Sequence, residues 1–227
     1  IKSINYKNKE LSKDTRINII KEISKTKLSL KNLRINKVVI NSKEVIKDDI
    51  FFTIKGKKND AHKYLNEVFK NKASIAVVQN THKNSSYTKQ IKVNNTLKFL
   101  TDCAKSWREN LNSKIIAITG SCGKTSLKEL LGSSLKIIST ASVSPKSYNN
   151  KYGVPLSLLN LNDTDNYGVL EVGMDKKGEI DNLSQIIKPN VSVITNINYA
   201  HAKNFKNIKQ IALAKAEIIK NILPNGF

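Results

Sequence analysis

The chain has 227 residues, of which 39% are hydrophobic and 25% are charged, and its formal net charge at pH 7 is +21. This length and composition exclude a wholly disordered chain and are typical of one large globular domain or two small ones. No apolar run approaches the roughly 18 residues of a membrane-spanning helix, and the first residues contain no apolar signal segment. We therefore expect a cytoplasmic protein without a membrane partner. Cys103 and Cys122 are too few for a disulfide framework and lack metal-cluster spacing, so we expect free thiols.

The positive charge is typical of proteins that bind nucleic acid, because basic side chains release counterions from phosphates. Only Arg16, Arg34 and Arg108 are arginines, however, and the chain is also rich in Asn and Ile. Lys, Asn and Ile share A/T-rich codons, so a bias in genome composition explains all three excesses at once. Phosphate recognition would instead favour the guanidinium group, which binds with two hydrogen bonds. We favour compositional bias, and nucleic-acid binding stays the alternative.

The first half of the chain has the pattern of a small α/β domain, which we place at residues 1–112. Apolar runs predict strands at 37–40, 50–54 and 74–78, and a helical stretch covers 63–72. Apolar residues at spacings of three and four then predict a helix that closes the domain. We expect the tryptophan of this stripe in the core. The stripe consists of Leu97, Leu100, Ala104, Trp107 and Leu111.

The second half, residues 113–227, alternates apolar strands with helical segments. This pattern is typical of a mostly parallel sheet covered by helices on both faces, as in P-loop-type domains. Binding sites in such sheets lie beyond the carboxyl ends of the strands. Strands are predicted at 115–119, 136–140, 167–172 and 191–195, and helices at 127–135, 178–187 and 207–222.

A glycine-containing segment, residues 119–126, joins the predicted strand 115–119 to the helix after it. Its glycines let backbone N–H groups and the helix N-terminus face one anion, Lys124 adds a positive charge, and the Thr125 hydroxyl can bind Mg²⁺. The common form of this motif has a glycine where this chain has Ile118. The alternative is an ordinary glycine-rich turn, but we expect a nucleoside triphosphate site. Its residues are Gly120, Ser121, Cys122, Gly123, Lys124, Thr125 and Ser126.

Glu171 lies at the carboxyl end of the predicted strand 167–172. The phosphate-binding segment lies at the same edge of the sheet, so a carboxylate here can hold the Mg²⁺ that Thr125 also contacts. The alternative is an exposed acid at a strand end. We favour the metal ligand because of the phosphate-binding segment upstream.

Lys215 interrupts an apolar stripe on the last predicted helix. The stripe is formed by Ile208, Ile211, Ile218 and Ile222, and Lys215 takes the missing position between them. A buried amine is costly unless it is paired, neutralised or chemically altered. The alternative is a side chain that reaches solvent along its own stem.

His201 follows the predicted strand 191–195, so it should lie at the same edge of the sheet as the phosphate-binding segment. A single histidine in a loop is more often structural than ligating. The residues alone therefore leave its role open.

Taken in their order along the chain, several motifs resemble those of the Mur ligase family. The resemblance extends from about residue 37 to the end. In the second half it includes segments 119–125, 148–156, 171–174, 196–201 and 214–218, and in the first half segments 41–43, 50–56 and 60–62.

The resemblance implies an ATP-dependent amide ligase of peptidoglycan precursor synthesis. Its substrates would be UDP-MurNAc-tripeptide and D-Ala-D-Ala, joined through an acyl phosphate. Residues 1–112 would bind the UDP-MurNAc peptide, and residues 113–227 would form the ATP-binding central domain. The cofactors would be ATP and two Mg²⁺ ions, and we expect a monomer.

Individual roles are also implied by the resemblance. Lys124 would contact the ATP phosphates, Thr125 and Glu171 would hold one Mg²⁺, and His201 would help to hold a second. Lys215 would be carbamylated and so become an anion beside the metals, which would satisfy its buried position. Lys124, Lys215 and His201 would be catalytic. The substrate-binding residues would be Ser42, Lys43, Asn149 and Asn150.

Four positions depart from the family pattern. Cys122 replaces an asparagine and places a thiol beside the nucleotide. Lys43 replaces an arginine and Asn41 an aspartate, so a contact with two hydrogen bonds is lost there. Ala61 replaces a glycine.

The resemblance also implies a further C-terminal domain after Phe227, so we expect this chain to be a fragment or a truncated product. Three alternatives remain. One is a folylpolyglutamate-type ligase with the same central domain, another is a non-catalytic nucleotide-binding remnant, and the third is a basic nucleic-acid-binding module.

Overall fold

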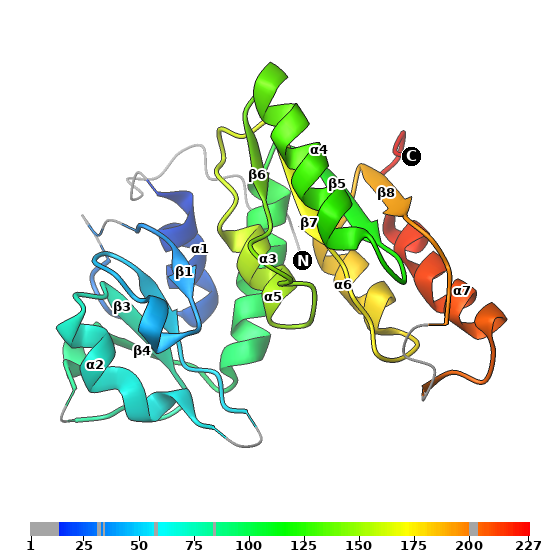
Figure 1. Ribbon diagram of the computed structural model, residues 1–227. Coiled ribbons are helices and arrows are strands. Elements are labelled where there is room, and N and C mark those ends of the chain that lie inside the picture. The colour runs from blue at the N-terminus through cyan, green and yellow to red at the C-terminus, as the bar shows by residue number, and fades with distance from the viewer. Residues whose placement is uncertain (1–13, 31–32, 34, 57–58, 84, 200–203) are drawn as a thin grey trace. The chain divides into compact units, whose positions relative to one another are not determined.

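The computed structural model describes residues 14–30, 33, 35–56, 59–83, 85–199 and 204–227 (Figure 1). The chain divides into two compact units, Ile1–Glu109 (unit 1) and Asn110–Phe227 (unit 2). The sequence pattern suggests a boundary slightly later, at residue 112. None of the described helices combines the length and the apolarity that crossing a bilayer requires.

Unit 1 contains a four-stranded parallel sheet in the order β1-β2-β3-β4. Every residue of the first three strands is buried, which explains why their sequences are continuous apolar runs. The strands are β1 (Val38–Val39), β2 (Ile50–Phe52), β3 (Ile75–Val78) and β4 (Gln90–Lys92). The helices are α1 (Thr15–Ser24), η1 (Ser42–Glu44), η2 (Ala61–Tyr64), α2 (Leu65–Lys70), η3 (Tyr87–Lys89) and α3 (Thr96–Asn110).

Leu100, Ala104 and Trp107 of the predicted stripe are buried on α3 in unit 1. Leu97 is half-buried, and Leu111 follows the end of the helix. Trp107 is only 3% exposed, and the Arg16 guanidinium lies 5.9 Å from the centre of its ring. The Phe99 ring stacks on Phe52 of β2 with 5.9 Å between the ring centres. Cys103 on the same stripe is buried, and this burial raises the pKa of its thiol. Both cysteines are free, as predicted.

Unit 2 contains a second four-stranded parallel sheet, in the order β6-β7-β5-β8. The strands are β5 (Lys114–Thr119), β6 (Ala141–Val143), β7 (Tyr167–Glu171) and β8 (Val191–Ile194). The helices are α4 (Lys124–Ile138), α5 (Gly153–Leu159), α6 (Glu179–Ile187), α7 (Ile208–Ala216) and η5 (Glu217–Asn221). The α/β class with mostly parallel sheets is therefore confirmed.

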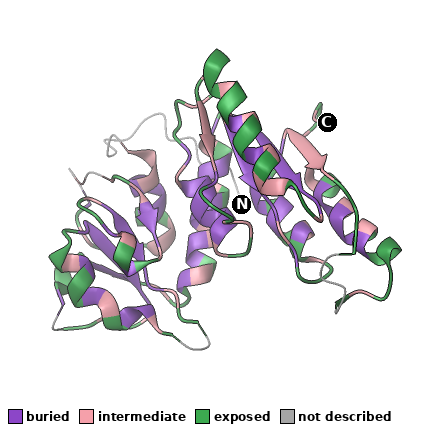
Figure 2. Ribbon diagram, in the orientation of Figure 1, coloured by how far each residue is buried: buried purple, intermediate pink, exposed green. Residues whose placement is uncertain are grey.

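Helices cover both faces of this sheet. Leu127, Leu131 and Leu135 of α4 pack against Ile116 and Val169 on one face. Helices α5 and α6 lie behind the other face, where every residue of α5 is buried (Figures 1 and 2). The carboxyl ends of β5, β7 and β8 are thereby left together at one edge.

Two predicted elements of unit 2 were wrong in their bounds. Residues 136–138 belong to α4 and not to a strand, and the strand in question is β6, which begins at Ala141. The apolar pair Ile137 and Ile138 suggested a strand, but these side chains are 85% and 76% exposed at the end of the helix. The helix predicted at 207–222 is divided, because α7 ends at Ala216 and the 3₁₀ helix η5 continues to Asn221.

Some elements had no clear signal in the sequence. Helix α1 begins where the Asp14 side chain accepts a hydrogen bond from the backbone N–H of Arg16 at 2.9 Å. Strand β4 and helix α5 were also not predicted. Each is short, so its periodicity is too weak to distinguish a helix from a strand.

We expect Gly132→Ala to destabilise the protein by about 1 kcal/mol. At an exposed helix position the same change would be stabilising, because alanine has a higher helix propensity than glycine. A Cβ atom at residue 132 would lie 2.2 Å from Cγ2 of Val143, so α4 could not keep its distance from β6. Urea denaturation measures the change. Ser133→Ala, on the exposed face of the same helix, is the matched control and should not lower the midpoint. A stabilised Gly132→Ala variant would contradict this packing.

Candidate functional site

The segment for which phosphate binding is predicted, residues 119–126, lies between the end of β5 and the first turn of α4. Gly120 has φ 151°, and a Cβ atom there would lie 1.8 Å from Oγ1 of Thr195, so only glycine fits. Gly123 has φ 79°, and a Cβ atom there would meet nothing within 4 Å, so the loop is open at this point. The Lys124 ammonium turns back and donates a hydrogen bond to the carbonyl of Gly120 at 2.8 Å.

The loop is tied to the residues that follow β8. The backbone N–H of Ser121 donates to the Asn196 carbonyl at 3.1 Å, and that of Cys122 donates to Asn196 Oδ1, also at 3.1 Å. The Thr195 hydroxyl donates to the carbonyl of Cys122 at 2.6 Å. Cys122 itself is exposed, and Ser126 lies on the first turn of α4. Two loop amides are therefore aimed at oxygen acceptors.

Thr125 and Glu171 meet at this edge of the sheet. The Thr125 hydroxyl donates to Glu171 Oε2 at 2.7 Å, and the Asn149 amide donates to Glu171 Oε1, also at 2.7 Å. Glu171 is 1% exposed, so the alternative of an exposed acid at a strand end is wrong. A buried carboxylate and a hydroxyl whose oxygens point at one another are ligands that Mg²⁺ prefers.

Lys215 is buried near the same edge, with 2% of its surface exposed. The alternative that it reaches solvent is therefore wrong. Burial, and secondly the positive charge of Lys124, lower the pKa of the Lys215 amine from 10.5 to about 8. Ile211 and Ile218 on its stripe are fully buried, whereas Ile208 is 40% exposed.

Helix α7 ends in a fixed position because of Glu217, two residues after Lys215. Its carboxylate is buried and accepts hydrogen bonds from the backbone N–H groups of Gly178, at 2.8 and 2.9 Å, and Asp181, at 3.2 Å. These groups belong to the N-terminus of α6, where a negative charge is favourable. His201, which we predicted at this edge of the sheet, is outside the described residues.

The other predicted residues of unit 2 lie in the segment before α5. Asn149 contacts Glu171, as described above. Asn150 is exposed, and its side-chain oxygen accepts hydrogen bonds from the backbone N–H groups of Tyr152 and Gly153, both at 3.0 Å. Asn150 therefore orders the turn that leads into α5.

The predicted substrate residues of unit 1 follow β1. Ser42 is buried in η1, and Lys43 is exposed beside it. The Asn41 side chain accepts a hydrogen bond from the backbone N–H of Lys43 at 3.2 Å. Asn41 can therefore make the same turn as the aspartate that it replaces.

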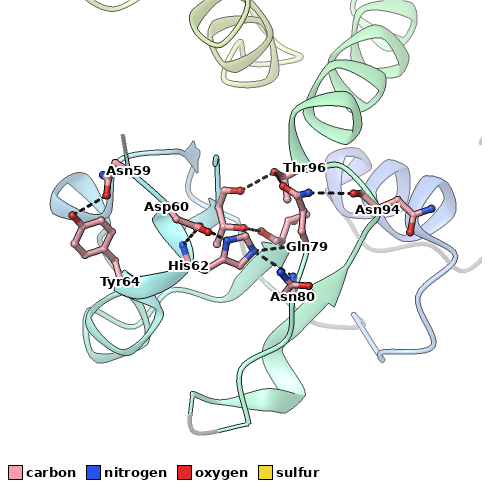
Figure 3. Close-up of polar contacts among 10 residues, drawn as sticks. Asn59, Asp60, His62, Tyr64, Gln79, Asn80, Asn94 and Thr96 are labelled. Carbon is pink, nitrogen blue, oxygen red and sulfur yellow. Dashed lines mark hydrogen bonds and ion pairs between the residues drawn. The ribbon is translucent and has the colours of Figure 1, made fainter. Parts of the chain in front are cut away.

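A buried histidine organises the carboxyl edge of the sheet in unit 1 (Figure 3). His62 Nδ1 lies 2.5 Å from the Asp60 carboxylate, and Nε2 accepts a hydrogen bond from the backbone N–H of Gln79 at 2.9 Å. Nδ1 therefore faces the carboxylate, and Nε2 faces the backbone that follows β3. The Thr53 hydroxyl lies within hydrogen-bond distance of both Nε2, at 3.0 Å, and the Val77 carbonyl, at 2.9 Å. The motif at residues 60–62 thus joins the ends of β2 and β3.

One buried charge in unit 2 was not predicted from the sequence. Lys128 is fully buried on α4, one turn beyond Lys124. A signal was available, because Lys128 shares the helical spacing of Leu131 and Leu135, just as Lys215 shares that of its isoleucines. The same reasoning about a lysine on an apolar stripe would have found it.

Comparison with known proteins agrees with this geometry. Residues 118–227 match the Mur ligase middle domain. The second unit of the chain therefore belongs to the Mur ligase middle-domain family. Two relatives are UDP-N-acetylmuramoyl-tripeptide–D-alanyl-D-alanine ligases. One, from Rickettsia prowazekii, is 39% identical over 84% of this chain and 42% of its own length. The other, from Buchnera aphidicola, is 38% identical over 86% of this chain and 42% of its own length.

Solved Mur ligase structures have the same fold. A MurF crystal structure from Acinetobacter baumannii matches with a TM-score of 0.80 and 32% identity, covering 92% of this chain and 47% of that one. MurF from Thermotoga maritima, solved in complex with ADP, matches with a TM-score of 0.71 and 33% identity, covering 85% and 45%. The chain spans less than half the length of these relatives.

We expect Lys124→Ala to raise the pKa of Lys215 from about 8, because the second cause of its shift is removed. The pKa should stay below 10.5, because burial remains. NMR of isotope-labelled lysine in CO₂-free buffer measures it. Lys136→Ala, an exposed lysine on α4, is the control and should change nothing. An unchanged pKa in Lys124→Ala would contradict an electrostatic effect of Lys124 on Lys215.

The same shift predicts how stability depends on pH. Between about pH 8 and 10.5, the unfolded chain holds the Lys215 proton more tightly than the folded chain does. The contribution of Lys215 to the free energy of unfolding should therefore rise with pH in this window, and the cost of the buried charge is fully present below it. Urea denaturation at a series of pH values measures this rise, and Lys215→Met should reduce it.

Proposed function

We propose that this chain is part of an ATP-dependent amide ligase that adds D-Ala-D-Ala to UDP-MurNAc-tripeptide through an acyl phosphate. The names of the relatives at 38% and 39% identity support this activity, and so does the family of the second unit. The observation that carries the proposal is the hydrogen-bonded set of Thr125, Glu171 and Asn149 directly beside the phosphate-binding loop. We place the reaction in the cytoplasm.

The loop fits a nucleotide phosphate. The backbone N–H of Cys122 already meets an oxygen acceptor, Asn196 Oδ1, at 3.1 Å, as it would meet a phosphate oxygen. Gly123 leaves the space in front of the loop open, and Lys124 stands at the N-terminus of a 15-residue helix. Backbone amides, a lysine and a helix N-terminus together favour a polyphosphate such as that of ATP. The relative solved with ADP supports the same assignment.

The residues around Glu171 also fit a magnesium ion. Thr125 and Glu171 would hold it, exchanging the hydrogen bond between them for bonds to the metal. A bound Mg²⁺ supplies positive charge that neutralises the phosphate oxygens. Asn149 keeps the carboxylate oriented from its other oxygen. His201 would help to hold a second ion.

In the reaction, a carboxylate attacks a phosphate, so two anions must approach one another. Lys124 would contact the ATP phosphates and reduce this repulsion, and the loop amides would hold them in line for transfer. The amine of D-Ala-D-Ala would then displace phosphate from the acyl phosphate. Ser42 and Lys43 in unit 1, with Asn149 and Asn150 in unit 2, would bind the UDP-MurNAc peptide.

Lys215 is the residue that we propose to be carbamylated. The neutral amine reacts with CO₂ to give a carbamate and one proton. A pKa of about 8 leaves a substantial neutral fraction near neutral pH, which an exposed lysine lacks. A carbamate at this position would also turn the repulsion of Lys124 into attraction.

We expect ADP to bind to this chain, and Lys124→Ala to weaken binding at least about tenfold, equivalent to about 1.4 kcal/mol. The reason is the loss of the positive charge that faces the phosphates. Isothermal titration calorimetry measures the dissociation constant. Lys136→Ala should bind as the unaltered chain does. If Lys124→Ala retains full affinity, the loop has no part in nucleotide binding.

Carbamylation predicts a separate signal. We expect ¹³C-labelled bicarbonate to give a carbamate resonance in the NMR spectrum of the chain, and Lys215→Ala to remove it. Lys209→Ala, an exposed lysine on the same helix, should keep the resonance. A spectrum without this resonance, or one that persists in Lys215→Ala, would count against the modification.

A further inference from the structure

Lys128 is a fully buried lysine that the mechanism above does not use. It lies on α4, one turn after Lys124, and its ammonium donates hydrogen bonds to the carbonyls of Ser144 at 2.7 Å and Lys146 at 2.5 Å. It also forms an ion pair with Glu129 at 2.9 Å. All of these groups belong to unit 2.

The free-energy cost of burying the Lys128 ammonium is offset mainly by its hydrogen bonds to the two carbonyls. A charge in the interior is costly unless polar partners replace its water. Glu129 is 60% exposed, so its ion pair contributes little. Charge-assisted hydrogen bonds, such as those from the ammonium to the two carbonyls, are stronger than neutral ones. An apolar side chain of similar length would fill the same space on α4 without this cost, but it could not hold the segment that follows β6.

That segment, residues 144–149, contains a strained backbone conformation that its contacts must stabilise. Lys146 has φ 49°, in the left-handed region that side chains other than glycine adopt with some strain. Its carbonyl is one of the two that Lys128 binds. The segment leads from β6 toward α5 and carries Asn149.

Both ends of this segment contact the region of the predicted metal ligand. The Ser144 hydroxyl accepts a hydrogen bond from the backbone N–H of Glu171 at 3.2 Å. At the other end, the Asn149 amide donates to Glu171 Oε1 at 2.7 Å, and its carbonyl accepts from the backbone N–H of Gly173 at 2.7 Å. A change in the segment would therefore move the partners of Glu171.

We propose that Lys128 is a positioning residue that holds residues 144–149 so that Asn149 orients Glu171 toward the metal. It acts through the segment and does not contact the nucleotide. The inference rests on the proposed function, because it assigns Lys128 a part in the same magnesium site. A purely structural lysine would stabilise the fold without any specific effect on Mg²⁺.

The test compares ADP binding with and without Mg²⁺ by isothermal titration calorimetry. In Lys128→Met, we expect the gain in ADP affinity that Mg²⁺ provides to fall at least about fivefold, while affinity without Mg²⁺ changes less than about twofold. Lys136→Met, on the exposed side of α4, is the matched control and should keep the full gain. Lys128→Gln, which retains a donor, is used if Lys128→Met does not fold.

Two further measurements separate the possible outcomes. Hydrogen exchange of the ligand-free chain should show faster exchange at the Gly173 amide in the Lys128 variant, since its acceptor belongs to the segment. In a double-mutant cycle, Lys128→Met should add little to the Mg²⁺ effect of Asn149→Ala, because both act through one path.

Each result then supports or overturns the inference. An unaltered chain that does not bind ADP refutes the proposed function, and the inference with it. If the unaltered chain binds with a Mg²⁺ gain and Lys128→Met keeps that gain, the inference alone is overturned. Equal losses with and without Mg²⁺, or unchanged exchange at Gly173, also overturn it, because they indicate a structural role only.

Discussion

Three charged groups in the interior of unit 2, Glu171, Glu217 and Lys128, are matched by polar partners, and the arrangement of the site follows from how each is matched. The carboxylate of Glu171 accepts hydrogen bonds from a hydroxyl and an amide. The carboxylate of Glu217 accepts hydrogen bonds from backbone N–H groups at a helix N-terminus. The ammonium of Lys128 is held by two carbonyls. Each pairing joins segments that are far apart in the sequence, so the charges fix the loops at the carboxyl edge of the sheet.

The parallel sheet explains why these segments meet at all. Strands β5 and β7 are neighbours, and each ends at the same edge, one in the phosphate-binding loop and the other in Glu171. Strand β8 lies on the other side of β5, and the residues after it contact the loop. The helices that cover the two faces leave this edge free. The fold therefore supplies the place, and a few polar residues supply its chemistry.

Much of this could be predicted from the sequence where one periodicity dominated. Buried strands such as β5, and the glycine-containing loop that joins β5 to α4, have strong local signals. The end of α4 has no such signal. Ile137 and Ile138 are apolar yet exposed, and an apolar pair indicates a strand as readily as a helix end. Lys215 was found because it breaks a stripe. Hydrogen bonds such as that from Asn149 to Glu171 depend on tertiary contacts, which no local pattern encodes.

If the loop binds a nucleotide as proposed, the hydrogen bonds of Asn196 to it would be exchanged for bonds to the phosphate. An incoming phosphate oxygen that takes the Cys122 amide has to displace the Asn196 side chain, so one hydrogen bond is lost for each that is formed there. The net enthalpy from this amide is therefore small, and selectivity for a polyphosphate has to come from charge. Release of Asn196 would also loosen the chain just after β8, so that occupancy of the loop is transmitted to the strand beside it.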